Sequence, residues 1–153
     1  MPKKLPVTNL KESSIRILSG VSLFTGLTPA DYRVALETSE VLRYDDNEVI
    51  FSQGEPCDGL YVILAGAVSI STTKDGRINR VKAGGVIGEL GLLCHALRTA
   101  TATSGGAGVI LLRVKQTHLN ELFKIEPKIY AMIMRNVAET LAQKVIELTP
   151  NDD

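Results

Sequence analysis

The sequence predicts a mainly β domain, a jelly roll or a small barrel, with helices at both ends. Between Val41 and Val114, apolar residues recur at every second position and glycines separate short segments. That pattern is typical of many short strands joined by tight turns. Before this region and after Pro127, apolar residues recur at helical spacing instead. The chain has 153 residues, 44% of them hydrophobic, which is enough for one sizeable core.

Residues 9–40 carry the N-terminal helical spacing in two segments. The first segment contains Leu10, Ile15, Ile17 and Leu18. The second begins at Thr28-Pro29-Ala30-Asp31, with threonine at the cap, proline at the first helical position and an acid three residues after the cap. These residue types satisfy free N–H groups and suit the helix dipole. We therefore expect a helix that starts at Pro29.

The strand region contains a hairpin and two further strands that can be placed individually. Residues 68–72 alternate apolar or threonine side chains with serine, and Lys74-Asp75-Gly76 then turns the chain into 78–81. This arrangement predicts a β-hairpin. Residues 99–103 alternate threonine and alanine, a glycine-rich turn follows at 105–108, and 109–114 is a compact apolar strand.

One long amphipathic helix is predicted over 127–148, from the helical recurrence of Tyr130, Ile133, Met134, Val137, Leu141, Val145 and Leu148. Such a helix packs on the core or on a second copy of the chain, with contact to a ligand as a further role. We expect a lead segment over 1–19, one domain over 20–148 that includes this helix, and a tail over 149–153.

Composition argues against several classes of protein. The 17 basic residues equal the 17 acidic ones, so no basic surface for nucleic acid is expected. Two cysteines do not make a secreted disulfide framework. The apolar run from Leu60 to Ile70 is broken by Gly66 and is shorter than the roughly 20 residues of a membrane span. We therefore expect a cytoplasmic protein that binds neither DNA nor membranes.

The segment over 86–102, VIGELGLLCHALRTATA, carries the chemistry. Its glycines, with Gly88 among them, allow close backbone approach and conformations denied to other residues. Arg98 offers a planar, permanently charged group that suits phosphate oxygens. Glu89, nine residues earlier, would repel a phosphate unless it faced a hydroxyl donor. One ligand with a phosphate and a neighbouring hydroxyl accounts for both residues.

At these residues the sequence resembles the cyclic nucleotide-binding domains of catabolite activator-type regulators, kinase regulatory subunits and gated channels. Their phosphate-binding pattern, Phe-Gly-Glu, a small-apolar run and Arg-Ser/Thr/Ala-Ala, falls on Ile87, Gly88, Glu89, Leu90 to Leu93, Arg98, Thr99 and Ala100. Upstream, the same family's strand and turn framework resembles Ile50, Gln53, Gly54, Asp58, Tyr61, Val62, Gly66 and Val68. The resemblance covers residues 20 to 145.

The resemblance implies an eight-stranded β-roll with N-terminal helices and a long C-terminal helix. It also implies a sensor of cAMP or cGMP that acts through a conformational change of that helix. Glu89 would accept the ribose 2′-hydroxyl, Arg98 would hold the cyclic phosphate, and N–H groups at Gly88 and after Leu97 would complete the cradle. The expected ligand-binding residues are Gly88, Glu89, Leu90, Arg98, Thr99 and Ala100.

Two departures from the family pattern bear on the site. Ile87 stands where the family usually has an aromatic residue, which changes the packing under the segment. Leu97 stands where many members have proline, so the loop before Arg98 is expected to be less rigid and the affinity lower. Thr99 can accept a hydrogen bond from the 2-amino group of guanine, so both nucleotides are expected to bind.

No enzyme activity, cofactor or metal is expected, because the sequence offers no activated nucleophile motif. The first alternative is a pseudo-sensor of the same fold that binds no nucleotide and serves as an interaction or dimerisation module, with Arg98 and Glu89 paired to protein groups. A weaker one is a small metalloenzyme based on Cys94 and His95, although His118 is the only other histidine. No helix-turn-helix pattern follows Leu148, so the expected partner is an effector protein, a second copy or a larger chain.

Overall fold

The computed structural model describes residues 2–5, 21–37, 39–74, 76, 78–89, 93 and 96–148. The predicted first helical segment, with Leu10 to Leu18, lies outside these residues. Strands are β1 (Lys3–Leu5), β2 (Glu40–Tyr44), β3 (Val49–Phe51), β4 (Gly59–Ala65), β5 (Ala67–Ser71), β6 (Ile78–Lys82), β7 (Val86–Ile87), β8 (Thr101–Ser104) and β9 (Val109–Lys115). Helices are the 3-10 turn η2 (Ser22–Phe24), α2 (Pro29–Glu37), α4 (Gln116–Ile125) and α5 (Pro127–Leu148).

The strands form two antiparallel sheets that face each other as a roll. One sheet has the order β1-β2-β9-β4-β7 and the other β3-β8-β5-β6. The described part of the chain has nine strands where eight were expected, and one of the nine is the short β1, which pairs with β2. The predicted mainly β roll with flanking helices and a long C-terminal helix is confirmed.

Strand β4 shows why the roll has two cores. All but the last of its residues are buried, because helices cover one face of its sheet and the second sheet covers the other. Leu60, Val62 and Leu64 belong to a cluster with residues of η2, α2, α4 and α5. Tyr61 and Ile63 belong to the second cluster, inside the roll. The period of two thus divides one strand between both cores.

The N-terminal helix begins as the sequence predicts. The Asp31 N–H donates to Thr28 Oγ1 at 3.2 Å, and the Thr28 N–H donates to Asp31 Oδ2 at 3.0 Å. This reciprocal pair is a capping box, and it satisfies N–H groups that the first turn leaves free. The predicted hairpin is also present, since β5 pairs with β6 from Ala67–Lys82 to Ser71–Ile78.

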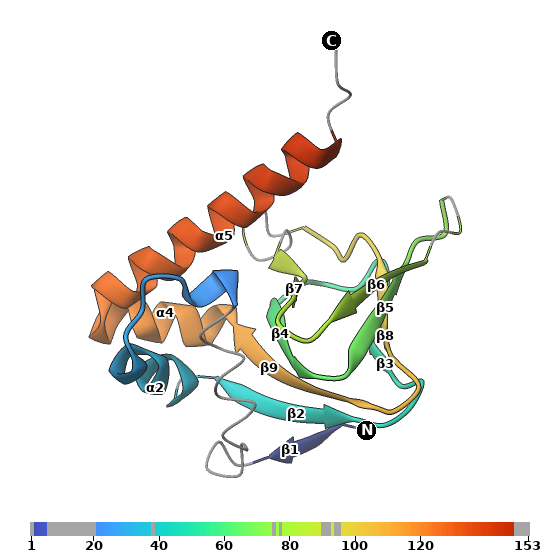
Figure 1. Ribbon diagram of the computed structural model, residues 1–153, viewed down its shortest axis with the longest axis horizontal. Coiled ribbons are helices and arrows are strands. Elements are labelled where there is room, and N and C mark those ends of the chain that lie inside the picture. The colour runs from blue at the N-terminus through green and yellow to red at the C-terminus, as the bar shows by residue number, and fades with distance from the viewer. Residues whose placement is uncertain are drawn as a thin grey trace.

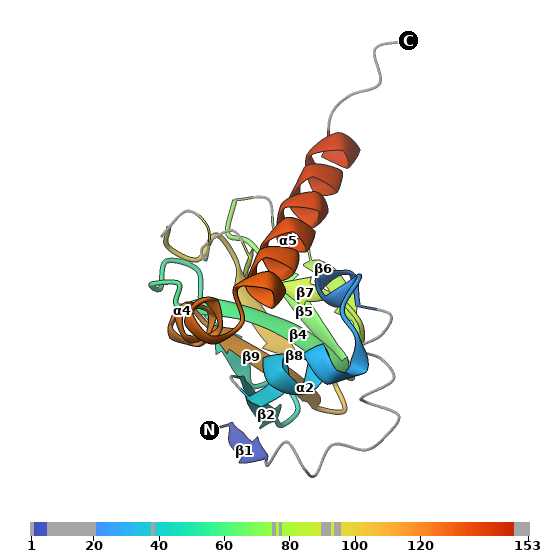
Figure 2. The ribbon, with the colours of Figure 1, turned by 90° about the vertical axis from the view of Figure 1, so that its left-hand side faces the viewer.

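Helix α5 buries side chains against the roll mainly in its first half, while Leu141 in the second half packs on the same core and is partly buried. Its buried residues, Ile129, Ile133, Asn136 and Val137, all come before residue 138. The side chain of Asn136 fixes this half by donating to the carbonyls of Leu23 and Thr25, each at 2.9 Å. From there the helix runs obliquely past β7, and its C-terminal end projects away from the roll (Figures 1 and 2).

Among the described residues, no helix is long and apolar enough to cross a membrane.

Candidate functional site

A cavity of about 550 Å³ lies between the roll and the second half of α5. Its walls come from the inner strands, from the segment after β7, from the segment before β8 and from one face of α5. The lining residues are Phe51, Ile70, Asn79, Val81, Val86, Ile87, Gly88, Glu89, Ala96, Leu97, Arg98, Thr99, Ala100, Lys144 and Glu147. Most of this wall is apolar, but it also carries a guanidinium, an ammonium and carboxylate groups.

Arg98 is a buried cation in the wall of this cavity. Its side chain is 4% exposed, and its guanidinium carbon lies 4.1 Å from the centre of the Phe51 ring. Nη1 donates to the Gly88 carbonyl at 3.3 Å, and Nη2 lies 3.8 Å from Asp58 Oδ1. Nε has no hydrogen-bond partner among the described residues. A buried charge with an unused donor has strong capacity for an anionic ligand.

The backbone around Arg98 is fixed by two hydrogen bonds. The Arg98 N–H donates to the Glu55 carbonyl at 2.8 Å, and the Gly54 N–H donates to the Arg98 carbonyl at 2.8 Å. Next to these two hydrogen bonds, Leu97 pairs with Pro56 in an isolated antiparallel bridge. This pairing holds the segment before Arg98 although leucine replaces proline. It also occupies the first N–H after Leu97, which the predicted phosphate cradle therefore cannot use while the bond is intact.

Gly88 permits the close approach of Arg98 to the backbone. Its φ is +82°, a conformation that side-chain-bearing residues rarely adopt. A Cβ at this position would lie 2.4 Å from Arg98 Nη1. Glycine is therefore required both by the backbone conformation and by the position of the guanidinium.

Glu89 is a buried carboxylate on the same wall. It is 4% exposed, and its Oε1 accepts a hydrogen bond from the ammonium of Lys144. Lys144 lies 55 positions later, on α5, and its side chain is 49% exposed. The ion pair therefore joins the predicted ligand segment to the second half of the C-terminal helix.

The aromatic neighbours of Arg98 do not neutralise its charge. Burial raises the pKa of Tyr61, so its phenol is neutral at physiological pH. Asp58, whose Oδ1 lies 3.8 Å from Arg98 Nη2, accepts a shorter bond from Arg113 Nη2 at 2.7 Å and has a side chain that is 58% exposed. Arg98 thus keeps most of its capacity for another anion.

The structure gathers five of the six predicted site residues around one cavity. Gly88, Glu89, Arg98, Thr99 and Ala100 all line it, and Leu90 lies outside the described residues. Sequence reasoning missed Lys144 and Glu147, which look like ordinary charges on a solvated helix face. It also missed Asn79 on β6.

The weaker alternative, a metalloenzyme, concerned Cys94, His95 and His118, and the structure describes only the last of these. The described residues contain no group of three or more potential metal ligands, and Cys94 and His95 lie outside them. His118 is used locally, because its Nδ1 accepts the N–H of Lys115 at 3.1 Å at the start of α4. Burial lowers the pKa of His118.

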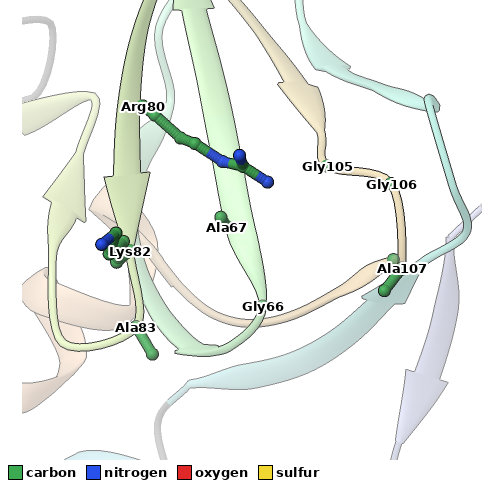
Figure 3. Close-up of a pocket in the computed structure, with 9 residues that line it drawn as sticks. Gly66, Ala67, Arg80, Lys82, Ala83, Gly105, Gly106 and Ala107 are labelled. Carbon is green, nitrogen blue, oxygen red and sulfur yellow. The ribbon is translucent and has the colours of Figure 1, made fainter.

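A second hollow, of about 410 Å³, lies at the turns that follow β4 and β8. Arg80 extends across β5 toward Gly105, and Lys82 lies nearby on β6 (Figure 3). Both basic side chains belong to exposed residues, and the hollow shares no lining residue with the first cavity. A small anion would gain little there, because exposed charges are well solvated.

Comparison with known proteins identifies relatives over most of the chain. The model of the family described as "Cyclic nucleotide-binding domain" matches residues 41–126. A cAMP-dependent protein kinase regulatory subunit of Mycosarcoma maydis is 32% identical over 95 residues, which are 60% of this chain and 18% of the relative. The cyclic AMP receptor protein of Thermus thermophilus is 27% identical over 134 residues, which are 85% of this chain and 60% of the relative.

Solved structures agree with these sequence relatives. The crystal structure of the Thermus thermophilus catabolite activator protein matches with a TM-score of 0.72 and 27% identity, over 82% of this chain and 59% of that chain. The N-terminal domain of a Streptomyces coelicolor transcriptional regulator matches with a TM-score of 0.73 and 27% identity, over 88% of this chain and 99% of that chain. The chain spans less than two thirds of the length of the sequence relatives named above. The resemblance seen in residues 86–102 is confirmed, and the chain belongs to the cyclic nucleotide-binding domain family.

Proposed function

We propose that this chain is a regulatory sensor that binds cAMP or cGMP in the cavity beside Arg98. The observation that carries the proposal is the buried guanidinium of Arg98, whose Nε has no partner among the described residues. A cyclic phosphate would supply acceptors for it in a site already shielded from water. Membership in the cyclic nucleotide-binding domain family supports the same ligand class.

Each predicted residue has a distinct role in this proposal. Arg98 holds the cyclic phosphate and Glu89 accepts the ribose 2′-hydroxyl, with Gly88 presenting its backbone to the ligand. The apolar part of the wall, which includes Ile70 and Val81, suits a purine ring. Thr99 lies beside Arg98 and lines the cavity, where its hydroxyl can accept from the 2-amino group of guanine.

The proposed outcome of binding is regulation rather than turnover. The groups proposed to contact the ligand, Arg98 and Glu89, suit recognition of a phosphate and a hydroxyl. We further propose that the domain extends over 20–148, that it acts in the cytoplasm, and that its output passes to an effector protein or a second copy of the chain.

The pseudo-sensor of the same fold is supported by a specific observation as well. Glu89 is paired with Lys144, and Arg98 has Asp58 at 3.8 Å, so both predicted ligand residues already have protein partners. Yet neither pair is complete, because Arg98 Nε is left over and Lys144 and Asp58 are about half exposed.

Isothermal titration calorimetry of the purified chain with cAMP and with cGMP separates the two candidates. The sensor predicts saturable binding of at least one of them with one site per chain. If both nucleotides give only heat of dilution, and circular dichroism shows that the chain is folded, the sensor is overturned and the pseudo-sensor is favoured.

A further inference from the structure

The ion pair of Glu89 with Lys144 has no part in the contacts proposed above for the nucleotide. It places an ammonium group on the carboxylate that the proposed function reserves for the ribose hydroxyl. Glu89 can accept more than one hydrogen bond, but the ammonium and a ribose hydroxyl would both approach it from the cavity that Lys144 lines. A bound nucleotide would therefore compete with Lys144 for Glu89.

The two partners differ in how easily they can lose the pair. Glu89 is 4% exposed, so without a partner it would be a poorly solvated charge. Lys144 is 49% exposed, so its ammonium can return to water at little cost. Glu147 offers Lys144 a second partner, because it lies three residues later on the same helix and lines the same cavity.

The pair also bears on the position of α5. In the stretch 138–147 no residue is buried, in contrast to Ile129, Ile133 and Val137 in the first half. Thr140, one turn before Lys144, is hydrogen-bonded to Ser22 at 3.3 Å. Beyond it, the ion pair of Lys144 with Glu89 links this part of the helix to the segment after β7.

We propose that Lys144 is a displaceable latch, which holds the second half of α5 on the empty pocket and is released when a nucleotide takes Glu89. The inference rests on the proposed function and adds its means of transmission. Release changes the restraint on 138–147 while Asn136 keeps the first half anchored to Leu23 and Thr25. The ligand shifts the helix only by as much as it binds the released state better.

A latch and an ordinary ligand contact predict opposite effects on nucleotide affinity when Lys144 is removed. If Lys144 only competes for Glu89, its removal tightens nucleotide binding. If Lys144 instead contacts the nucleotide directly, its removal weakens binding. The sign of the change therefore decides between the two roles.

The test compares Lys144→Met with Lys128→Met, which makes the same substitution at an exposed position in the first turn of α5. Calorimetry with cAMP and with cGMP measures both dissociation constants. We expect Lys144→Met to bind about two- to fivefold more tightly than wild type, the range for a partly exposed ion pair. Lys128→Met should match wild type, and Lys144→Arg should restore most of the wild-type value. Unchanged or weaker binding by Lys144→Met overturns the latch.

Hydrogen exchange provides a readout that does not depend on affinity. Without nucleotide, Lys144→Met should exchange faster than wild type over 138–147 and equally over 127–137. Nucleotide should raise exchange over 138–147 in wild type and change it little in the variant. If exchange over 138–147 is the same in wild type and variant, the ion pair does not hold the helix and the proposal fails.

A double-mutant cycle assigns the effect to Glu89. In a Glu89→Gln background, adding Lys144→Met should leave the dissociation constant unchanged, because the competition no longer exists. A gain as large as in the wild-type background would place the effect of Lys144 elsewhere and overturn the proposal. If wild type binds neither nucleotide, the proposed function itself fails, whereas binding by wild type without a gain in Lys144→Met refutes the latch alone.

Discussion

Replacing Arg98 by methionine should abolish nucleotide binding and leave the fold intact. Methionine has a similar length and no charge, so the cavity wall keeps most of its volume. The substitution removes the donor to the Gly88 carbonyl, the contact with the Phe51 ring and the weak pair with Asp58. It also removes the buried Nε that has no partner among the described residues.

The loss of affinity can be worked from the contacts the guanidinium would make. A planar guanidinium gives a phosphate two charge-assisted hydrogen bonds, each worth about 1.5–3 kcal/mol. Losing both raises the dissociation constant by at least about 100-fold. Lysine keeps the charge as a point donor without the fork, so Arg98→Lys should lose at least about tenfold.

Stability should change far less than affinity. The ring contact of Arg98 with Phe51 is worth about 0.5–2 kcal/mol. Its loss is offset by removal of a buried charge with an unused donor, and Asp58 is left 58% exposed with its bond to Arg113 intact. For a domain of this size, 1 kcal/mol corresponds to about 2–4 °C in Tm. We expect Arg98→Met to melt within about 4 °C of wild type.

Calorimetry and thermal melting of wild type, Arg98→Met and Arg98→Lys test this reasoning together. The matched control is Arg80→Met, which removes an exposed arginine from the separate hollow and should leave both nucleotide affinities unchanged. A folded Arg98→Met protein that binds within threefold of wild type would refute the assignment of Arg98. A Tm lowered by more than about 10 °C would show that Arg98 is mainly structural.

Three further changes test the neighbours of Arg98. In wild type, 2′-deoxy-cAMP should bind about tenfold more weakly than cAMP, because Glu89 loses a charge-assisted hydrogen bond; calorimetry should show that the difference shrinks in Glu89→Gln, and equal binding to wild type contradicts the role. Gly88→Ala should lower both Tm and affinity, since its Cβ would lie 2.4 Å from Arg98 Nη1 and the φ of +82° costs alanine about 1–2 kcal/mol; in Gly54→Ala, where a Cβ meets nothing within 4 Å, Tm alone should fall. Thr99→Ala should weaken cGMP by one neutral hydrogen bond, about 0.5–1.5 kcal/mol, and cAMP little; an unchanged ratio of the two dissociation constants would make Thr99 a strand residue only.

Features set by neighbouring residues could be predicted from the sequence. The capping box of Thr28 and Asp31 depends on side chains three residues apart, and the hairpin between β5 and β6 depends on a short turn. Helix α4 was missed because β9 passes into it without glycine, proline or a serine or threonine cap. The signal available was the spacing of Leu119 and Leu122, both buried on one face of α4.

The charged site residues that the sequence did not predict lie on α5. No local pattern encodes where this helix passes the roll. Glu89 and Arg98 are nine residues apart, and the pattern between them was enough to place both on one cavity. Lys144 and Glu147 reach that cavity through the direction of α5, whose first half is anchored by Asn136 and Val137. From the sequence alone, a lysine and a glutamate three residues apart indicate an ordinary solvated pair.

The distribution of burial among the charges of the cavity points to a site that exchanges partners. Its two buried charges, Arg98 and Glu89, each face a partner that is about half exposed, Asp58 and Lys144 respectively. The exposed member of each pair can be rehydrated when a ligand replaces it, whereas the buried member cannot. Binding a phosphate and a hydroxyl therefore improves the surroundings of Arg98 and Glu89 and costs their present partners little. Of the two partners, Lys144 is the one carried by α5, so under the proposed function ligand exchange at Glu89, rather than at Arg98, would be the step that reaches the helix.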